Sequence, residues 1–143
     1  MEISVVRKRL NETIERAKRQ AAERRSRSDQ ASRDFELFLQ KIAVPLFRQV
    51  ANALKAEGYA FTVFTPSGSV RLMSDRSASD YVELTLDTSA NPPQVVGQVM
   101  RERGRRVLDS ERTIGAPETL TEDQLLDFLL KELEAFAEHL ANG

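Results

Sequence analysis

The sequence predicts a two-layer α+β fold, in which an antiparallel meander of four or five strands is flanked by long helices. Apolar residues recur every three or four positions near both ends of the chain, as in amphipathic helices. Between these regions, short segments rich in β-branched and aromatic residues are separated by Pro, Gly and Asn turns. Connections this short force neighbouring strands to run antiparallel. We expect a charged N-terminal helix over residues 1–28 and one domain over 29–143, comprising a helix over 29–57, the meander over 59–111 and a helix over 121–141.

The composition is that of a globular protein with a mainly aliphatic core. Of the 143 residues, 41% are hydrophobic and 30% are charged, whereas aromatic residues make up only 6% and Trp is absent. A chain of this length suits a single domain. The absence of cysteine excludes disulfides, thiolate chemistry and cysteine-based metal sites.

The N-terminal segment over residues 2–28 contains no Gly or Pro and consists largely of good helix formers. Its apolar stripe is narrow and fades into alanine, so the helix cannot be stable alone, because isolated helices depend on packing. It is expected to lie on another surface, to pair with a second copy, or to fray. The stripe consists of Ile3, Val6, Leu10, Ile14, Ala17 and Ala21.

A second, broader apolar stripe predicts a buried helix that ends near Gly58, a residue typical of a helix C-cap. Ser26–Asp29 is the expected break before it, because Ser and Asp prefer caps to helix interiors. Pro45 interrupts the stripe and predicts a kink or a second short helix that starts there. One continuous helix from residue 2 to 57 is the alternative. The stripe consists of Phe35, Phe38, Leu39, Ile42, Leu46, Val50 and Leu54.

The meander follows from five segments joined by short turns. Tyr81–Asp87 alternates most regularly, with Val82 and Leu84 on one face and Glu83 on the other, as in a sheet with one buried face. Pro66 and Gly68 occupy the second and fourth positions typical of a type I turn. The predicted strands are Tyr59–Thr65, Ser69–Ser74, Tyr81–Asp87, Gln94–Arg103 and Arg105–Ser110.

The C-terminal helix begins with a capping box, in which Thr121 is followed three residues later by Gln124. Its apolar arc is wider than one sheet face requires, so a second cover is expected from a partner subunit or from the N-terminal helix. The main side consists of Leu126, Leu129, Leu133, Phe136 and Leu140, and the arc is widened by Leu125, Phe128 and Leu130.

Charge is distributed unevenly along the chain. Residues 1–30 contain nine Lys or Arg and five Asp or Glu, whereas residues 117–143 contain one Lys and seven acidic residues. Residues 31–116 are nearly balanced, with eleven basic and ten acidic residues. A basic start and an acidic end are expected to attract each other, within one chain or between neighbours. A basic arm is also typical of nucleic-acid binding, and two solvated helix faces would explain the same charges.

No catalytic, cofactor-binding or metal-binding residue is predicted. The single histidine, His139, lies near a helix C-terminus, where a protonated imidazole is mildly stabilising, and the sequence supplies no orienting partner for it. The carboxylates in turns and at the start of the last helix are explained by structure, because Asp stabilises turns and acidic groups are favourable at helix N-termini. Glycine-rich phosphate loops are also missing. The sequence therefore favours a non-enzymatic role over an enzyme built on carboxylates.

Four arginines within six residues surround the predicted turn at Gly104. Guanidinium groups bind phosphate and carboxylate well, so a contact with nucleic acid or an acidic protein is one hypothesis. No aromatic residue is interleaved to stack bases, and edge hairpins also use charge to prevent aggregation. The candidate contact residues are Arg101, Arg103, Arg105 and Arg106.

The sequence predicts an interaction or assembly protein that forms a helix-mediated homo-oligomer, most simply a homodimer. A nucleic-acid-associated protein with a basic hairpin and a basic N-terminal helix is the alternative. The chain has no run of about 18 apolar residues and only a short apolar patch before Arg7, so a cytoplasmic protein without membrane contact is expected. The candidate interface residues are Ile3, Val6, Leu10, Ile14, Leu125, Phe128 and Leu130.

Overall fold

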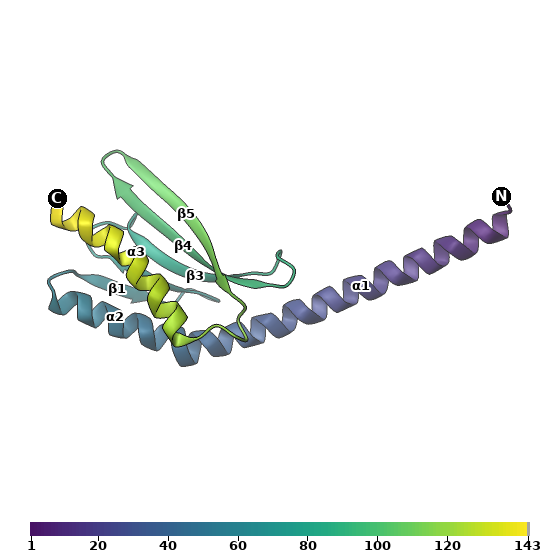
Figure 1. The fold of residues 1–143 in the computed structure, drawn as a ribbon, viewed down its shortest axis with the longest axis horizontal. Helices are drawn as coiled ribbons and strands as arrows, with labels where there is room; N and C mark the ends of the chain where they lie inside the picture. The colour runs from purple at the N-terminus through teal and green to yellow at the C-terminus, as the bar shows by residue number, and fades with distance from the viewer. Residues whose placement is uncertain (143) are drawn as a thin grey trace.

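In the computed structural model, a five-stranded antiparallel sheet lies against one half of a long helical rod (Figure 1). The structure describes the backbone of residues 1–142 and the burial of side chains 1–138. The predicted α+β class, with an antiparallel meander between long helices, is confirmed. The elements are α1 (Ile3–Phe38), the π-helical segment η1 (Leu39–Ala43), α2 (Val44–Ala56), β1 (Phe61–Phe64), β2 (Val70–Ser74), β3 (Tyr81–Asp87), β4 (Gln94–Arg103), β5 (Arg106–Gly115) and α3 (Glu122–Asn142).

The rod consists of α1, η1 and α2 without a non-helical residue between them. The break expected at Ser26–Asp29 was wrong, because α1 runs through all four residues. Ser and Asp cost only about 0.5 kcal/mol each in a helix interior, and the Arg, Glu, Gln and Ala residues around them favour the helix. The helical run is therefore continuous from Ile3 to Ala56, and it is kinked near Pro45, as the sequence predicts (Figure 1).

The π-helical segment lies directly before Pro45. Proline has no N–H, and its ring crowds the carbonyl four residues earlier, so a regular α-turn is disfavoured here. Instead, the N–H of Val44 donates to the carbonyl of Leu39, five residues back. The widened turn holds one extra residue, which rotates α2 by about 100° relative to a regular helix. Phe47 therefore remains on the same side of the rod as Phe35, and both are buried.

The sheet has the strand order β1-β2-β3-β4-β5, so each strand pairs with the next one in the sequence. The predicted bounds of β3 and β4 agree with the structure, whereas β1 is shorter and β5 extends to Gly115. Tyr81 pairs with Met100 at the end of the β3–β4 ladder. Beyond that pair, β4 pairs with β5 from Arg101 to Arg103. The β4–β5 hairpin therefore projects past β3 (Figure 1).

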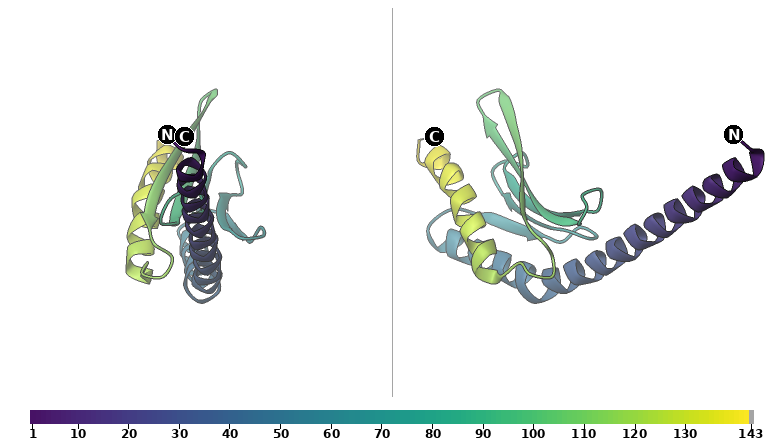
Figure 2. Two further views of the ribbon diagram at one scale, coloured as in Figure 1. Left: turned by 90° about the vertical axis from the view of Figure 1, so that its right-hand side faces the viewer. Right: turned by 45° about the vertical axis from the view of Figure 1, so that its right-hand side comes forward.

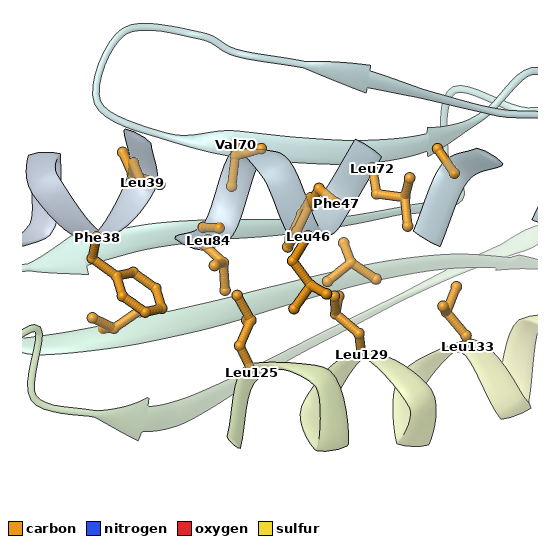
Figure 3. Close-up of a cluster of buried hydrophobic side chains, with 14 of the residues drawn as sticks. Phe38, Leu39, Leu46, Phe47, Val70, Leu72, Leu84, Leu125, Leu129 and Leu133 are labelled. Atoms are coloured by element: carbon orange, nitrogen blue, oxygen red, sulfur yellow. The ribbon is translucent and has the colours of Figure 1, made fainter. Parts of the chain in front are cut away.

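The core lies between one face of the sheet and the two helices α2 and α3. Phe47 of α2 and Leu125 and Leu129 of α3 are fully buried together with Leu72 and Leu84 of the sheet (Figure 3). These side chains are mostly aliphatic, as the composition predicts. The last turns of α1 also belong to this core, through Phe35 and Phe38.

A capping box at its start and an ion pair to β5 accompany the apolar packing of α3. The capping box predicted from Thr121 and Gln124 is present: the Gln124 N–H donates to Thr121 Oγ1 (3.2 Å), and the Thr121 N–H donates to Gln124 Oε1 (3.0 Å). Further along, the buried carboxylate of Glu132 lies 3.1 Å from Nε of Arg112 on β5. The geometry of this pair is not that of a hydrogen bond, so it is an ion pair alone.

Candidate interaction surfaces

The apolar stripe of α1 is exposed along the N-terminal part of the rod, which projects away from the sheet (Figures 1 and 2). Its large side chains are exposed to 82% at Ile3, 48% at Val6, 55% at Leu10 and 41% at Ile14. Ala17 is also exposed, and Ala21 is half-buried. We call these six residues the α1 seam.

The α1 seam is on the same side of the helix as the buried end of α1. Residues seven positions apart lie nearly in line, because seven residues make about two turns. Ile14, Ala21, Ser28 and Phe35 follow one another at this spacing. Phe35 is 3% exposed. The face of α1 that packs on the sheet in the last turns is therefore the face left uncovered in the first five.

Basic residues flank the α1 seam. At about 100° per residue, Arg7, Lys18 and Arg25 follow one edge, and Arg9 and Arg27 follow the other. All five side chains are exposed. Most acidic residues of the segment lie on the opposite side of the helix, namely Glu12, Glu15 and Glu23. The exceptions, Glu2 and Asp29, lie near the edges of the seam.

A second apolar surface lies between α2 and α3, over the start of β1. It is a groove of about 530 Å³, which we call the α2/α3 groove. Leu130 on its α3 wall is 56% exposed. Glu57 and Glu134 line the groove together with otherwise mostly apolar side chains: Leu46, Gln49, Val50, Ala53, Leu54, Tyr59, Phe61, Leu126, Leu133, Phe136 and Ala137.

The structure separates the three α3 residues that the sequence assigned to an interface. Leu125 is fully buried, so it belongs to the core of the protomer and offers no surface. Phe128 is half-buried, and its ring packs on Gly97 of β4, where a Cβ atom would overlap it. Leu130 is exposed and lines the α2/α3 groove. The α2 wall of this groove was not predicted, because the apolar stripe that includes Val50 and Leu54 indicates a buried helix face, whereas both side chains are only half-buried.

The predicted arginine cluster lies at the projecting tip of the β4–β5 hairpin. Directly paired residues on neighbouring strands point to the same face, and Arg103 pairs with Arg106. Arg101, two residues before Arg103, also lies on that face. Arg105 lies in the two-residue turn with Gly104, whose φ of 62° fits the first position of a type II′ turn. Three of the four arginines therefore share one face of the tip.

Arg71 does not add to this basic tip, although it lies on the same sheet. Its guanidinium pairs with the buried Glu83 (Nε to Oε1, 3.2 Å) and lies over the ring of Tyr81, 4.0 Å from its centroid. Ser69 donates to the same carboxylate. Arg71 is therefore engaged in a contact within the sheet.

The carboxylates of Asp75 and Asp80 in the β2–β3 turn, and of Asp87 at the opposite end of β3, each have a separate structural contact. Asp75 accepts from Thr62 Oγ1 (2.6 Å), and the buried Asp80 accepts from the N–H of Glu102 (2.7 Å). The hydroxyl of Ser89 and then its N–H donate to Asp87 and lower the pKa of that carboxyl. Within residues 1–138, no three acidic or histidine side chains come together as a metal site would need.

Another hollow, of about 750 Å³, lies beside the π-helical segment. Phe35 and Leu39 line it from the rod, and hydroxyl groups of the β1–β2 turn, including Ser67 and Ser69, line it from the sheet. Its charged lining residues, Glu36 and Arg48, come from different helices. No arrangement of acid, base and nucleophile is present among these residues.

The side chain of His139 and that of Leu140 lie outside the described residues. Across residues 1–142, none of the helices has a stretch both long and apolar enough to span a lipid bilayer. Comparisons with protein-family models, with curated proteins and with solved structures found no match to this chain.

Proposed function

We propose that this chain is a non-enzymatic assembly protein, which self-associates through the α1 seam. The observation that carries the proposal is the exposure of Ile3, Val6, Leu10 and Ile14 on one face of a projecting helix. An apolar stripe that stays exposed to water does not stabilise a helix, whereas such a stripe is typical of a helix that packs against a partner.

The energetics support this role. Complete burial of one aliphatic side chain of this size is worth about 1.5–3 kcal/mol, so covering four of them yields a substantial driving force. The first turns of α1 pack on no other element, and helices without tertiary packing are only marginally stable in water. Self-association would therefore also stabilise the N-terminal half of the rod.

The test compares two substitutions at equally exposed positions of α1. Ile14 lies on the seam and Val5 lies on the opposite side of the helix, and both are 41% exposed. We expect wild type and Val5→Asp to be at least dimeric at tens of micromolar by light scattering, whereas Ile14→Asp is monomeric. A monomeric wild type, or equal behaviour of the two variants, contradicts the proposal.

A second candidate function is contact with nucleic acid through the β4–β5 tip. It is favoured by the register, which gathers Arg101, Arg103 and Arg106 on one face of a hairpin that extends beyond the sheet. Arginines in this arrangement would bind phosphates with little dependence on sequence and with strong dependence on salt.

Fluorescence anisotropy with labelled duplex and single-stranded DNA and RNA tests this candidate. We expect binding at low salt that falls steeply as salt is added, and that is lost when Arg101, Arg103 and Arg106 are replaced by Ala. Affinity that is unchanged by these three substitutions, or no binding at low salt, removes the hairpin from consideration.

A further inference from the structure

We propose that the α1 seam of one copy binds in the α2/α3 groove of a second copy. This inference rests on the proposed self-association through α1 and adds the surface that receives the helix. Both surfaces are apolar and uncovered in the protomer, with Leu10 55% exposed on one and Leu130 56% exposed on the other.

The two surfaces match in length. Ile3 and Ile14 are eleven residues apart, which corresponds to ~16 Å along a helix at ~1.5 Å per residue. The α2 wall of the groove runs from Leu46 to Glu57 and the α3 wall from Leu126 to Ala137, each with the same separation. Helices that bind in grooves typically present anchors on one face at spacings of three, four and seven residues. The α1 seam has such anchors at Ile3, Val6, Leu10 and Ile14.

The two surfaces also match in charge. The edges of the α1 seam are mainly basic, as described above, and the groove is lined by Glu57 and Glu134. The exposed charges of α3 up to residue 138 are acidic except for Lys131; they are Glu122, Asp123, Asp127, Glu134 and Glu138. Opposite charges across an interface favour the encounter and fix the register.

Charge argues against the simpler pairing of two α1 seams with each other. A face-to-face pair would place Arg7, Arg9 and Arg27 of one helix beside the same basic edges of its partner. Like charges at the edges of a helix pair oppose association. The acidic groove therefore accepts the α1 seam better than a second α1 seam does.

The groove of the same copy is out of reach of α1. Since α1 continues through η1 into α2, which forms one wall of the groove, the N-terminal end of α1 points away from it. The N-terminus of α1 lies at the opposite end of the molecule from α2 and α3, which form the walls of the groove (Figures 1 and 2). A second copy is thus the occupant that this chain can supply.

A complementation experiment with the full-length chain tests the inference. Ile14→Asp disables the seam but retains the groove, whereas Leu130→Asp disables the groove but retains the seam. We expect each variant alone to be monomeric at a concentration where wild type associates, and an equimolar mixture to form a 1:1 heterodimer in sedimentation velocity. Leu37→Asp is the control, because Leu37 is 49% exposed on the rod but belongs to neither surface.

The outcomes separate this inference from the proposed function. If Leu130→Asp still associates as wild type does while Ile14→Asp is monomeric, α1 mediates assembly but the groove does not receive it. A mixture that remains monomeric also overturns the inference. If wild type itself is monomeric, the proposed function and the inference both fail.

A charge-reversal variant gives a second test that does not change the apolar surface. Glu57 and Glu134 are both exposed, so E57K/E134K is expected to retain the fold. We expect self-association to weaken about tenfold or more at low salt, and the difference from wild type to shrink as salt screens the charges. Unchanged or stronger self-association of this variant overturns the inference, because a seam-to-seam pair would not involve these glutamates.

Discussion

The two halves of the helical rod present one apolar face to different surroundings. In the C-terminal half, Phe35, Phe38 and Phe47 are buried against the sheet, whereas Ile3 and Leu10 on the same face of the N-terminal half are exposed. The apolar stripe is narrower in the N-terminal half, but it continues the same face of the helix, and the sheet lies opposite only the C-terminal half. The periodicity of apolar residues therefore predicts which face of a helix packs against another surface. Whether that surface belongs to the same chain depends on the three-dimensional arrangement.

The largest expected effect on the free energy of unfolding comes from shortening one apolar side chain on this face in each half of the rod. Phe47→Ala is expected to lower the free energy of unfolding by about 3–5 kcal/mol, because it leaves a cavity in a fully buried site. Leu10→Ala is expected to change it by less than about 0.5 kcal/mol in the monomer, since Leu10 is already exposed. Denaturant unfolding at a concentration below self-association measures both. Similar losses for the two variants would mean that the first turns of α1 are packed in solution.

An intermediate effect is expected from filling space between the sheet and α3, on the covered side of the molecule. A Cβ atom at Gly97 would overlap the ring of Phe128, so Gly97→Ala should cost about 1–3 kcal/mol through overpacking. The cost should fall in a Phe128→Leu background, where the ring is absent. A double-mutant cycle by denaturant unfolding gives the coupling between the two positions. Zero coupling would show that the ring is not held on Gly97.

The smallest effect concerns pH and is confined to the sheet. The pKa of Asp87 is lowered by donation from Ser89, so this carboxylate contributes stability above its ordinary pKa of 3.8 and loses it as the pH falls through the lowered value. Ser89→Ala should therefore reduce stability slightly at neutral pH, and the reduction should shrink as the pH falls through the lowered pKa of Asp87. Midpoints of urea unfolding at neutral and at acidic pH measure the difference. A larger effect of the substitution in acid than at neutral pH would contradict this linkage.

Local patterns in the sequence predicted the elements whose signals are local. The alternation of Tyr81–Asp87 and the capping box at Thr121 agree with the structure. The end of β5 was missed, because its last residues are held by long-range pairing, such as Gly115 with Val95. The break at Ser26–Asp29 was wrong, because the helix formers around it outweigh the three weak ones, Ser26, Ser28 and Asp29.

The candidate surfaces were predictable only in part, for a geometric reason. The α1 seam could be listed from sequence because it lies on a single helix. The α2/α3 groove is formed by helices about seventy residues apart in the sequence, and no local pattern shows that their walls meet. Rotation of α3 about its axis decides that Leu125 is buried and Leu130 is exposed, although both belong to the same apolar arc.

The sheet has two open edges, β1 and β5, and each differs from an edge that invites strand addition. β1 has only four residues, and β5 carries charges at Arg106, Asp109, Glu111 and Arg112 along its length. Short or charged edges disfavour pairing with strands of other chains. Growth by backbone hydrogen bonding, as in amyloid, is thereby opposed at both ends of the meander, which is compatible with the helix-mediated assembly proposed above.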